Sequence, residues 1–276
     1  MSLVHLNFYS QYLKGNTNVN IVLPSVNPFG KPDFDMICQE KKYPVLWLLH
    51  GTYGDYSTWV RSSNIERYAN EAGIIVVMPD ALNSGYSNWP CFGLGYQMSD
   101  YLTQELMPLI RCWFPVSKLA HHNFIGGYSA GGYGAMKYGF ENPDLFGGMI
   151  ILSAPPYDIS QYHPDEDSPD YIRVRNEENN VGDLKQYYNS FHNPAWAVNE
   201  FVRSGKTLKL YFAIGKSDFL YSKHIEFLEL AKKVGLKAIV EAYEGYSHDF
   251  AFWDFAIQKG IKQIINEEDN DERSAE

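Results

Sequence analysis

Residues 123–140 read "NFIGGYSAGGYGAMKYGF", an apolar run that leads through a Gly-rich turn into a helical pattern. The centre of this stretch, residues 127–131, has the pattern G-x-S-x-G. In this pattern the serine occupies a sharp turn from a strand into a helix, and the glycines remove side chains where backbones approach too closely. The turn lifts the Ser129 hydroxyl clear of the sheet and leaves the Ala130 N–H at the helix start, where it favours an oxyanion. The stretch therefore predicts Ser129 as a nucleophile and Ala130 as an oxyanion donor.

A serine hydroxyl attacks only when a base takes its proton, so a histidine must reach Ser129 from elsewhere in the fold. The chain has eight histidines. His248 follows the last strand-like run, in "YEGYSHDFAFW", which places it at the carboxyl edge of the sheet, where open α/β sheets keep their sites. We predict His248 as the base. Six of the others fall where surface or structural roles are expected, and His50 belongs to a loop described below.

An acid that orients the histidine is expected between Ser129 and His248 in the chain, after the preceding strand. The run "LKLYFAIGKSDFLY" supplies Asp218 at this place. Its carboxylate would hold the imidazole tautomer and stabilise the imidazolium that forms during attack. The alternative role for Asp218 is the N-cap of the following helix, and Asp249 and Asp80 are alternative acids.

A second oxyanion donor usually comes from the loop after an earlier strand. The segment "LLHGTYGDYSTW" at residues 48–59 fits this position, because Gly51 lets the backbone bend and directs the N–H of Thr52 toward the pocket. The alternative is a glycine-rich turn without a catalytic role. Aromatic residues crowd these loops and predict a substrate-binding surface for a short acyl group or a sugar ring. They are Tyr53, Trp59, Tyr128, Phe219 and Tyr246, with Phe250 beside them.

Strand-like and helix-like runs alternate along the chain, which predicts an α/β fold with a mostly parallel central sheet and helices on both faces. An antiparallel hairpin is expected first, with strands at 3–13 and 19–24 around the turn signal "KGNTN". Buried strands are predicted at 43–51 and 74–80, and further strands at 122–127, 147–156, 207–215 and 237–245. Helices are predicted at 58–73, 96–114, 130–143 and 223–235, with a last helix within 250–265.

The alternation fails between about residues 157 and 206, which we interpret as a lid-like insertion into a single domain of residues 1–276. Asn193 and Pro194 predict the start of at least one short helix there. The acidic residues near 165–170 lack the glycine-centred spacing of a calcium loop, so no metal site is predicted. The acidic tail from about residue 267 is expected to be disordered.

Composition excludes several classes of protein. The formal charge of −10, without a stripe of Lys and Arg, argues against nucleic-acid binding. No run of eighteen apolar residues predicts a membrane span, and the N-terminus lacks a signal-peptide pattern, so a cytoplasmic location is expected. The odd set of Cys38, Cys91 and Cys112, without metal-like spacing, fits a reducing compartment. Homo-oligomerisation is left open.

At these motifs the chain resembles the α/β-hydrolase superfamily, and within it the esterase D-like group. This group includes tributyrin esterases, carbohydrate acetyl and feruloyl esterases, and S-formylglutathione hydrolases. The resemblance covers roughly residues 20–265 and rests on "LLHGTYGDYSTW", "GGYSAGGYGAM", "GKSDFLY" and "GYSHDFAFW" in this order. It implies the α/β-hydrolase fold and the same five site residues, Ser129, Asp218, His248, Thr52 and Ala130. It also implies a hydrolase that needs no cofactor.

The expected activity is that of a serine carboxylesterase acting on small-molecule esters of short acyl groups, in the acetyl or butyryl class and including acetylated sugars. The alternatives are an S-formylglutathione hydrolase or a feruloyl esterase, followed by an acyltransferase and a non-catalytic binding module. Formylglutathione hydrolases usually carry a histidine where this chain has Tyr128.

Overall fold

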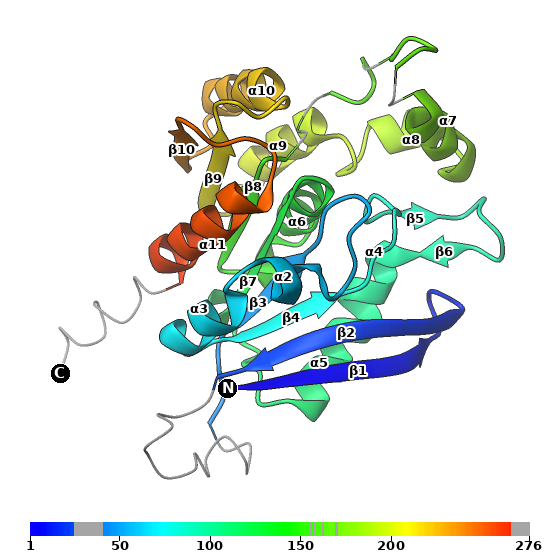
Figure 1. Cartoon of the computed structure of the whole chain (residues 1–276). Coiled ribbons are helices and arrows are strands. Elements are labelled where there is room, and N and C mark those ends of the chain that lie inside the picture. Colours follow the sequence, from blue (N-terminus) through cyan, green and yellow to red (C-terminus); the bar gives the residue numbers. More distant parts are fainter. Residues whose placement is uncertain (25–40, 155, 157, 162, 169–170, 266–276) are drawn as a thin grey trace.

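A single sheet of eight strands forms the centre of the computed structural model, which describes residues 1–24, 41–154, 156, 158–161, 163–168 and 171–265. The strand order is β1-β2-β4-β3-β7-β8-β9-β10. The pairs β1–β2 and β2–β4 are antiparallel, and all later pairs are parallel, so the predicted mostly parallel sheet is confirmed (Figure 1). The strands are β1 (Ser2–Ser10), β2 (Gly15–Leu23), β3 (Val45–Leu49), β4 (Ile75–Pro79), β7 (Asn123–Tyr128), β8 (Gly148–Leu152), β9 (Lys209–Gly215) and β10 (Ile239–Tyr243).

Helices cover both faces of the sheet, as predicted (Figure 1). Side chains alternate between the faces along each buried strand. On β3, Trp47 and Leu49 pack into a core with the helices α5 (Met107–Trp113), α6 (Ala130–Glu141), α9 (Pro194–Arg203) and α10 (Tyr221–Val234). Leu46 and Leu48 pack into a second core with α2 (Thr58–Ser62), α3 (Ile65–Ala72) and α11 (Phe250–Ile264). Burial on both faces explains why these strands are continuous apolar runs.

The N-terminal hairpin is confirmed, but its turn lies earlier than predicted. Residues 11–14 form the turn, and most of the predicted turn segment at 14–18 belongs to β2. The hydroxyl of Ser10 accepts a hydrogen bond from Leu13 N–H at 3.0 Å, and Lys14 adopts a left-handed φ of 55°. These local interactions close the chain before the Gly-Asn signal is reached.

The single helix predicted at 58–73 is wrong, because the chain forms α2 and α3 with a break between them. Ser63 is extended at the break, and its hydroxyl donates to the carbonyl of Trp59 at 2.6 Å. Such a side-chain bond competes with the helical pattern. Asn64 N–H and Nδ2 donate to the carboxylate of Asp254 at 2.7 and 2.9 Å, which fixes the break against α11.

The helix predicted at 96–114 begins two residues later. Tyr96–Gln97 is strand β6, which pairs with β5 (Asn88–Trp89) in a small antiparallel ribbon that the sequence did not predict. The helix then runs through α4 (Met98–Asp100), a π-helical turn at Tyr101–Leu106 and α5. Asn88 Oδ1 accepts from the N–H of Ser99 at 2.9 Å, so the ribbon caps the helix start.

The segment predicted as an insertion contains α7 (Tyr171–Asn180), α8 (Leu184–Tyr188) and α9. Asn193 caps α9 through a 3.2 Å bond from Ala195 N–H, and Pro194 is its first residue, as predicted. Val198 and Phe201 of α9 are buried in the main core. By contrast, α7 and α8 lie above the core, next to the β5–β6 ribbon (Figure 1).

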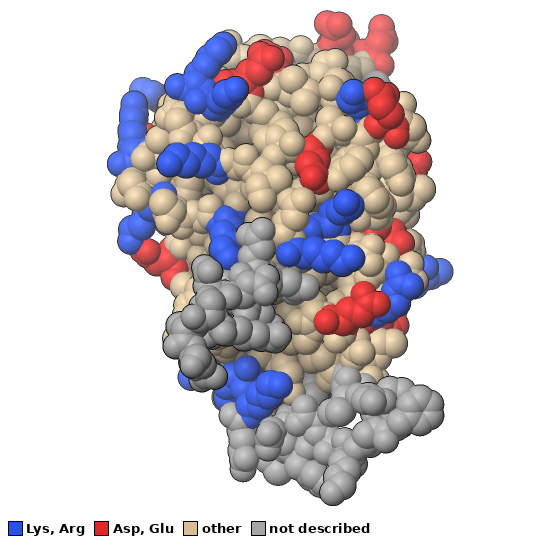
Figure 2. Space-filling view, turned by 90° about the vertical axis from the view of Figure 1, so that its left-hand side faces the viewer, with Lys and Arg blue, Asp and Glu red and all other residues tan. Residues whose placement is uncertain are grey.

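The surface is mixed in charge. Lys and Arg side chains are separated by acidic and uncharged ones over the described residues of the face in Figure 2, where no continuous basic stripe runs. The exclusion of nucleic acid stays a prediction. None of the helices in the described ranges has the length and apolar character of a membrane span. Cys91 and Cys112 are exposed free thiols, whereas Cys38 and the acidic tail from about residue 267 lie outside the described residues.

Candidate active site

The predicted turn between strand and helix is present at Ser129. It follows β7 directly and precedes α6, with φ 52° and ψ −123°, a conformation that costs a non-glycine residue on the order of 1–3 kcal/mol. Its N–H donates to Leu152 O of β8 at 2.9 Å, and its carbonyl accepts from Tyr133 N–H at 3.0 Å. A Cβ at Gly131 would stand 2.4 Å from Leu49 O, so only glycine lets α6 pass this close to β3.

Of the three residues predicted to work together, His248 lies within hydrogen-bond distance of both of the others. His248 Nε2 is 3.1 Å from Ser129 Oγ, and His248 Nδ1 is 2.8 Å from Asp218 Oδ2. Ser129 follows β7, Asp218 follows β9, and His248 follows β10, so all three stand at the carboxyl edge of the parallel sheet. With Nδ1–H donating to the carboxylate, Nε2 is left as the acceptor that faces the Ser129 hydroxyl.

Asp218 is built to remain ionised. Its side chain is almost fully buried, and burial by itself raises the pKa of a carboxyl. The hydrogen bonds from His248 and from Leu220 N–H, the latter at 2.9 Å to Oδ1, outweigh burial and hold the pKa of Asp218 below its ordinary value. Asp218 therefore accepts from both the imidazole and the N–H of Leu220, in the turn before α10. The N-cap of α10 is Leu220 and no side chain caps this helix, so the alternative role of Asp218 as the N-cap is wrong.

The two alternative acids have other partners. Asp249 adjoins the histidine, but its carboxylate caps α11 by accepting from Phe252 N–H at 3.2 Å. Asp80 accepts from Leu82 N–H at 3.1 Å and lies 3.8 Å from Nε2 of His50 rather than near His248. The geometry thus brings Asp218, and neither of these, to the imidazole of His248.

Thr52 and Ala130, the two residues predicted to supply oxyanion donors, line the same cavity. Among the hydrogen bonds of the described residues, neither amide donates to a protein acceptor. Ala130 is the first residue of α6, where N–H groups lack helical partners and the helix dipole favours negative charge. The arrangement leaves two donors for an oxygen that becomes negative next to Ser129.

His50 holds the loop that carries Thr52. The buried imidazole accepts from Ala81 N–H at 3.0 Å through Nε2, which leaves Nδ1–H to donate to Gly51 O at 2.8 Å. Burial is the largest influence on this group and lowers the pKa of His50, so the neutral tautomer that both bonds require is favoured. Tyr86 OH donates to His50 O at 2.7 Å, which provides a further hydrogen bond that holds the same loop.

Tyr86 is itself anchored from α6. Its carbonyl accepts from Tyr138 OH at 2.7 Å and from the ammonium or amine of Lys137, which is only 2% exposed. Burial lowers the pKa of Lys137 to about 7. A chain of contacts therefore runs from Lys137 through Tyr86 and His50 to the loop of Thr52.

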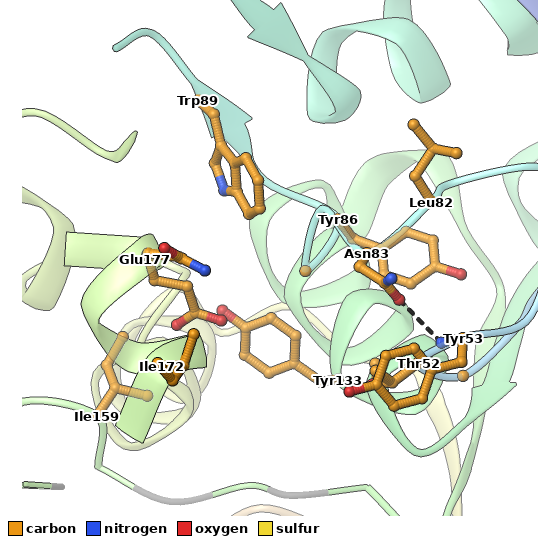
Figure 3. A pocket seen from close by; sticks show the side chains of 14 residues that line it. Thr52, Tyr53, Leu82, Asn83, Tyr86, Trp89, Tyr133, Ile159, Ile172 and Glu177 are labelled. Atoms are coloured by element: carbon orange, nitrogen blue, oxygen red, sulfur yellow. Dashed lines mark hydrogen bonds between the residues drawn. The ribbon is translucent and has the colours of Figure 1, made fainter. Parts of the chain in front are cut away.

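The cavity beside these groups has a volume of about 270 Å³ (Figure 3). One side is formed by the loop of residues 51–53, and Tyr53 N–H donates to Asn83 Oδ1 at 2.8 Å, the dashed line in Figure 3. Tyr86 and Tyr133 form further walls, and α7 closes the opposite side. The lining residues are Gly51, Thr52, Tyr53, Leu82, Asn83, Gly85, Tyr86, Trp89, Ala130, Tyr133, Ile159, Ile172, Asn176 and Glu177.

The five aromatic residues predicted to bind substrate fall into two groups in the structure, those exposed near the site and those packed away from the cavity. Tyr53 lines the cavity and is 91% exposed, and Phe219 is exposed with its ring centroid 4.6 Å from that of His248. Trp59 and Tyr128 do not line the cavity, which corrects their predicted role. They are buried in the core against α11, where their rings meet at 5.3 Å and Trp59 Nε1 donates to Leu49 O. Tyr246 is half-buried and stacks on Phe255 at 5.2 Å, also away from the cavity.

Several residues of the site were not predicted. Asn83, Tyr86 and Trp89 come from residues 81–97, where the sequence has no helical or alternating period. Glu177 comes from α7 in the insertion. The sequence contains one clue to this part of the site, because Lys137 stands among apolar residues of a predicted helix. A lysine that is buried at such a position needs a specific partner, which here is the carbonyl of Tyr86. Within the described ranges, no three His, Cys, Asp or Glu side chains are grouped to hold a metal ion.

Comparison with known proteins agrees with this geometry. The sequence profile of the Esterase family, described as "Putative esterase", matches residues 10–264. An acetyl esterase of Caldicellulosiruptor saccharolyticus is 29% identical, in an alignment that covers 95% of this chain and 97% of that protein. FphF, a fluorophosphonate-binding serine hydrolase of Staphylococcus aureus, is 30% identical with a TM-score of 0.80 over 96% of this chain and 99% of that one. The S-formylglutathione hydrolase FrmB of S. aureus is 28% identical with a TM-score of 0.76 over 95% and 97%.

Proposed function

The chain belongs to the Esterase family and is a serine hydrolase of carboxylic esters, and we propose that it cleaves short-chain acyl esters through Ser129, His248 and Asp218. The α/β-hydrolase fold and the esterase D-like resemblance expected from the sequence are thereby confirmed, while the substrate and the residue roles are proposals. The observation that carries them is the pair of short contacts from His248, 3.1 Å to Ser129 Oγ and 2.8 Å to Asp218 Oδ2.

The proposed reaction has two steps. Ser129 Oγ attacks the ester carbonyl while His248 Nε2 takes its proton, and Asp218 stabilises the imidazolium that results. The carbonyl oxygen becomes an oxyanion and accepts from the N–H groups of Thr52 and Ala130. The alcohol then leaves with the proton from His248, and water hydrolyses the acyl-enzyme by the same route.

The preference for a short acyl group is supported by two observations. The cavity of about 270 Å³ is slightly smaller than the usual range for ligand sites, about 300–1,000 Å³, so it is poorly suited to enclose a long alkyl chain. A relative with 29% identity is an acetyl esterase. We propose that α7 and α8 act as a lid over this cavity, because α7 supplies Ile172, Asn176 and Glu177 to its lining. The single-domain organisation and the cytoplasmic location stay predictions.

The test is a series of p-nitrophenyl esters from acetate to palmitate. We expect kcat/KM to be highest for acetate or butyrate and to fall steeply for longer chains. The Ser129→Ala variant should lose turnover by a factor on the order of a million while unfolding at the same temperature. Normal turnover in a folded Ser129→Ala protein, or a maximum at palmitate, would contradict the proposal.

A second candidate is hydrolysis of S-formylglutathione, favoured by the similarity to FrmB. The same serine, histidine and acid would act on a thioester. Formate release from S-formylglutathione, compared with acetate release from the short esters at equal enzyme concentration, distinguishes the two activities.

A further inference from the structure

We propose that Phe219 is a specificity-determining residue whose ring packs against the alcohol portion of the ester and favours alcohols that carry a flat ring, either aromatic or sugar. This inference rests on the proposed function, because it concerns the alcohol that leaves when Ser129 is acylated. The acyl group and the alcohol portion are thereby assigned to different surfaces, the cavity for the first and the ring of Phe219 for the second.

The position of the leaving alcohol follows from the proton that it receives. His248 Nε2 gives this proton to the alcohol oxygen, so this oxygen must come within about 3 Å of the imidazole. Thr52 and Ala130 line the cavity of about 270 Å³, but neither His248 nor Phe219 belongs to its described lining. With the carbonyl oxygen at the two oxyanion donors, the acyl group points into the cavity. The alcohol portion then lies on the side of His248.

Among the described residues, two aromatic rings pack next to the imidazole of His248. The ring centroid of Trp253 is 4.9 Å away, but this residue is buried in the core and stacks on Tyr128 at 4.0 Å. The ring centroid of Phe219 is 4.6 Å away, and Phe219 is 76% exposed. Single exposed apolar side chains are common on protein surfaces. Phe219 differs from these because an alcohol portion held at His248 comes within reach of its ring.

The turn that carries Phe219 is fixed by backbone hydrogen bonds. Asp218 N–H donates to Gly215 O at 3.1 Å, and Ser217 N–H donates to Tyr246 O at 3.0 Å in the loop before the catalytic histidine. The turn therefore keeps its place relative to the imidazole. The α10 helix that follows the turn lies well apart from α7, which closes the cavity (Figure 1). A surface that is already in place loses little conformational entropy when a substrate packs against it.

A flat ring on the alcohol gains most from this contact. Two aromatic rings in an offset or edge-to-face arrangement contribute about three- to tenfold in affinity beyond the burial of their area. The apolar face of a pyranose ring can cover the ring of Phe219 in the same way and leave its hydroxyl groups in water. A flexible alkyl alcohol must instead be ordered on binding, which offsets part of its contact. We therefore expect alcohols with a ring to be preferred over alkyl alcohols.

The experiment uses four acetates: ethyl acetate, butyl acetate, benzyl acetate and the acetate of methyl glucoside at its primary hydroxyl group. All four form the same acetyl-enzyme, so they differ only up to the step in which the alcohol leaves, and kcat/KM reports this step. For each substrate, kcat/KM of a variant is divided by that of the wild-type protein, so differences in intrinsic reactivity cancel.

Phe219→Ala should lower the ratio for at least one of the two ring substrates by about three- to tenfold relative to ethyl acetate, and that for butyl acetate by no more than about twofold. A loss with benzyl acetate alone identifies an aromatic alcohol, a loss with the acetylated glucoside alone identifies a sugar, and a loss with both identifies the ring face that they share. Phe219→Tyr keeps the ring and should keep the preference. The control Tyr9→Ala removes a 54% exposed aromatic side chain from β1 at the far edge of the sheet and should change no ratio by more than about twofold.

The outcomes separate this inference from the function on which it rests. If Phe219 only holds the imidazole in place, Phe219→Ala will lower all four ratios equally, which would overturn the contact with the alcohol and leave the esterase proposal standing. An equally large change in the preference for ethyl butyrate over ethyl acetate would also overturn it, because the ring would then contact the acyl group. Failure of the wild-type protein to hydrolyse any of the acetates would refute both proposals.

Discussion

Replacing Asp218 with asparagine separates the two hydrogen bonds that its carboxylate accepts. Oδ1 accepts from Leu220 N–H at 2.9 Å, and Oδ2 accepts from His248 Nδ1 at 2.8 Å. In Asp218→Asn the amide oxygen can keep the bond to Leu220, which leaves the NH₂ group facing the imidazole. An NH₂ group donates, so it favours the tautomer with the proton on Nε2, the atom 3.1 Å from Ser129 Oγ. In that tautomer His248 cannot take the proton of Ser129.

The expected loss in kcat is about 10⁴-fold, which corresponds to about 5.5 kcal/mol of transition-state stabilisation. The unfolding free energy should change by no more than about 1 kcal/mol, because the bond from Leu220 N–H in the turn before α10 is preserved. Asp218→Ala removes both bonds, so it should lose turnover and also about 1–2 kcal/mol of stability. The pair of variants distinguishes a catalytic effect from a structural one.

The assay is p-nitrophenyl acetate hydrolysis, combined with urea unfolding of each protein. The control is Asp249→Asn, since the Asp249 carboxylate caps α11 by accepting from Phe252 N–H at 3.2 Å. Near-normal turnover in Asp218→Asn, or a large kinetic defect confined to Asp249→Asn, would refute the assignment of Asp218.

Two further predictions concern the framework around the site. Lys137→Met removes a buried amine whose pKa is lowered by burial from 10.5 to about 7. Between these pH values the unfolded chain binds the proton and the folded protein does not, so the unfolding free energy of the wild-type protein should rise by up to about 1.4 kcal/mol for each unit of increasing pH because of this residue. Urea unfolding at several pH values in this range should show a smaller rise of unfolding free energy with pH for the variant, and an equal rise would contradict the assigned burial. Gly131→Ala should cost about 3 kcal/mol or more, because the new Cβ would stand 2.4 Å from Leu49 O, whereas the control Gly205→Ala, with open space but a φ of 68°, should cost about 1 kcal/mol in thermal unfolding. Similar losses for the two glycine variants would argue against the close approach of α6 to β3.

The parts of the fold that could be predicted are those where burial and backbone geometry act together. The strand that ends at Tyr128, directly before Ser129, is buried on both faces, and the glycines beside it are required by contacts as short as 2.4 Å. Both signals are strong in a single sequence. The three residues around His248 could be predicted as well, because parallel strands bring their carboxyl ends to one edge.

The remainder depends on contacts between distant segments. The break between α2 and α3 is fixed by Asp254, which lies 190 residues from Asn64 along the chain. The spacing of apolar residues within 58–73 therefore could not predict this break. The aromatic assignments failed for Trp59 and Tyr128 because loop position does not determine which way a side chain points. Glu177 could not be assigned to the cavity, since α7 reaches it only through the tertiary fold.

The central claim is that Ser129 is an activated nucleophile, and covalent labelling with a fluorophosphonate tests it most directly. Such a reagent loses fluoride when an activated serine oxygen attacks phosphorus. We expect one adduct per chain by intact mass, located on Ser129 by peptide sequencing. Ester hydrolysis should be lost in proportion to the fraction of the protein that is labelled. Ser129→Ala should not be labelled, and His248→Ala should be labelled at a rate lower by several orders of magnitude. Stoichiometric labelling of another residue, or full hydrolytic activity in a protein labelled at Ser129, would contradict the account.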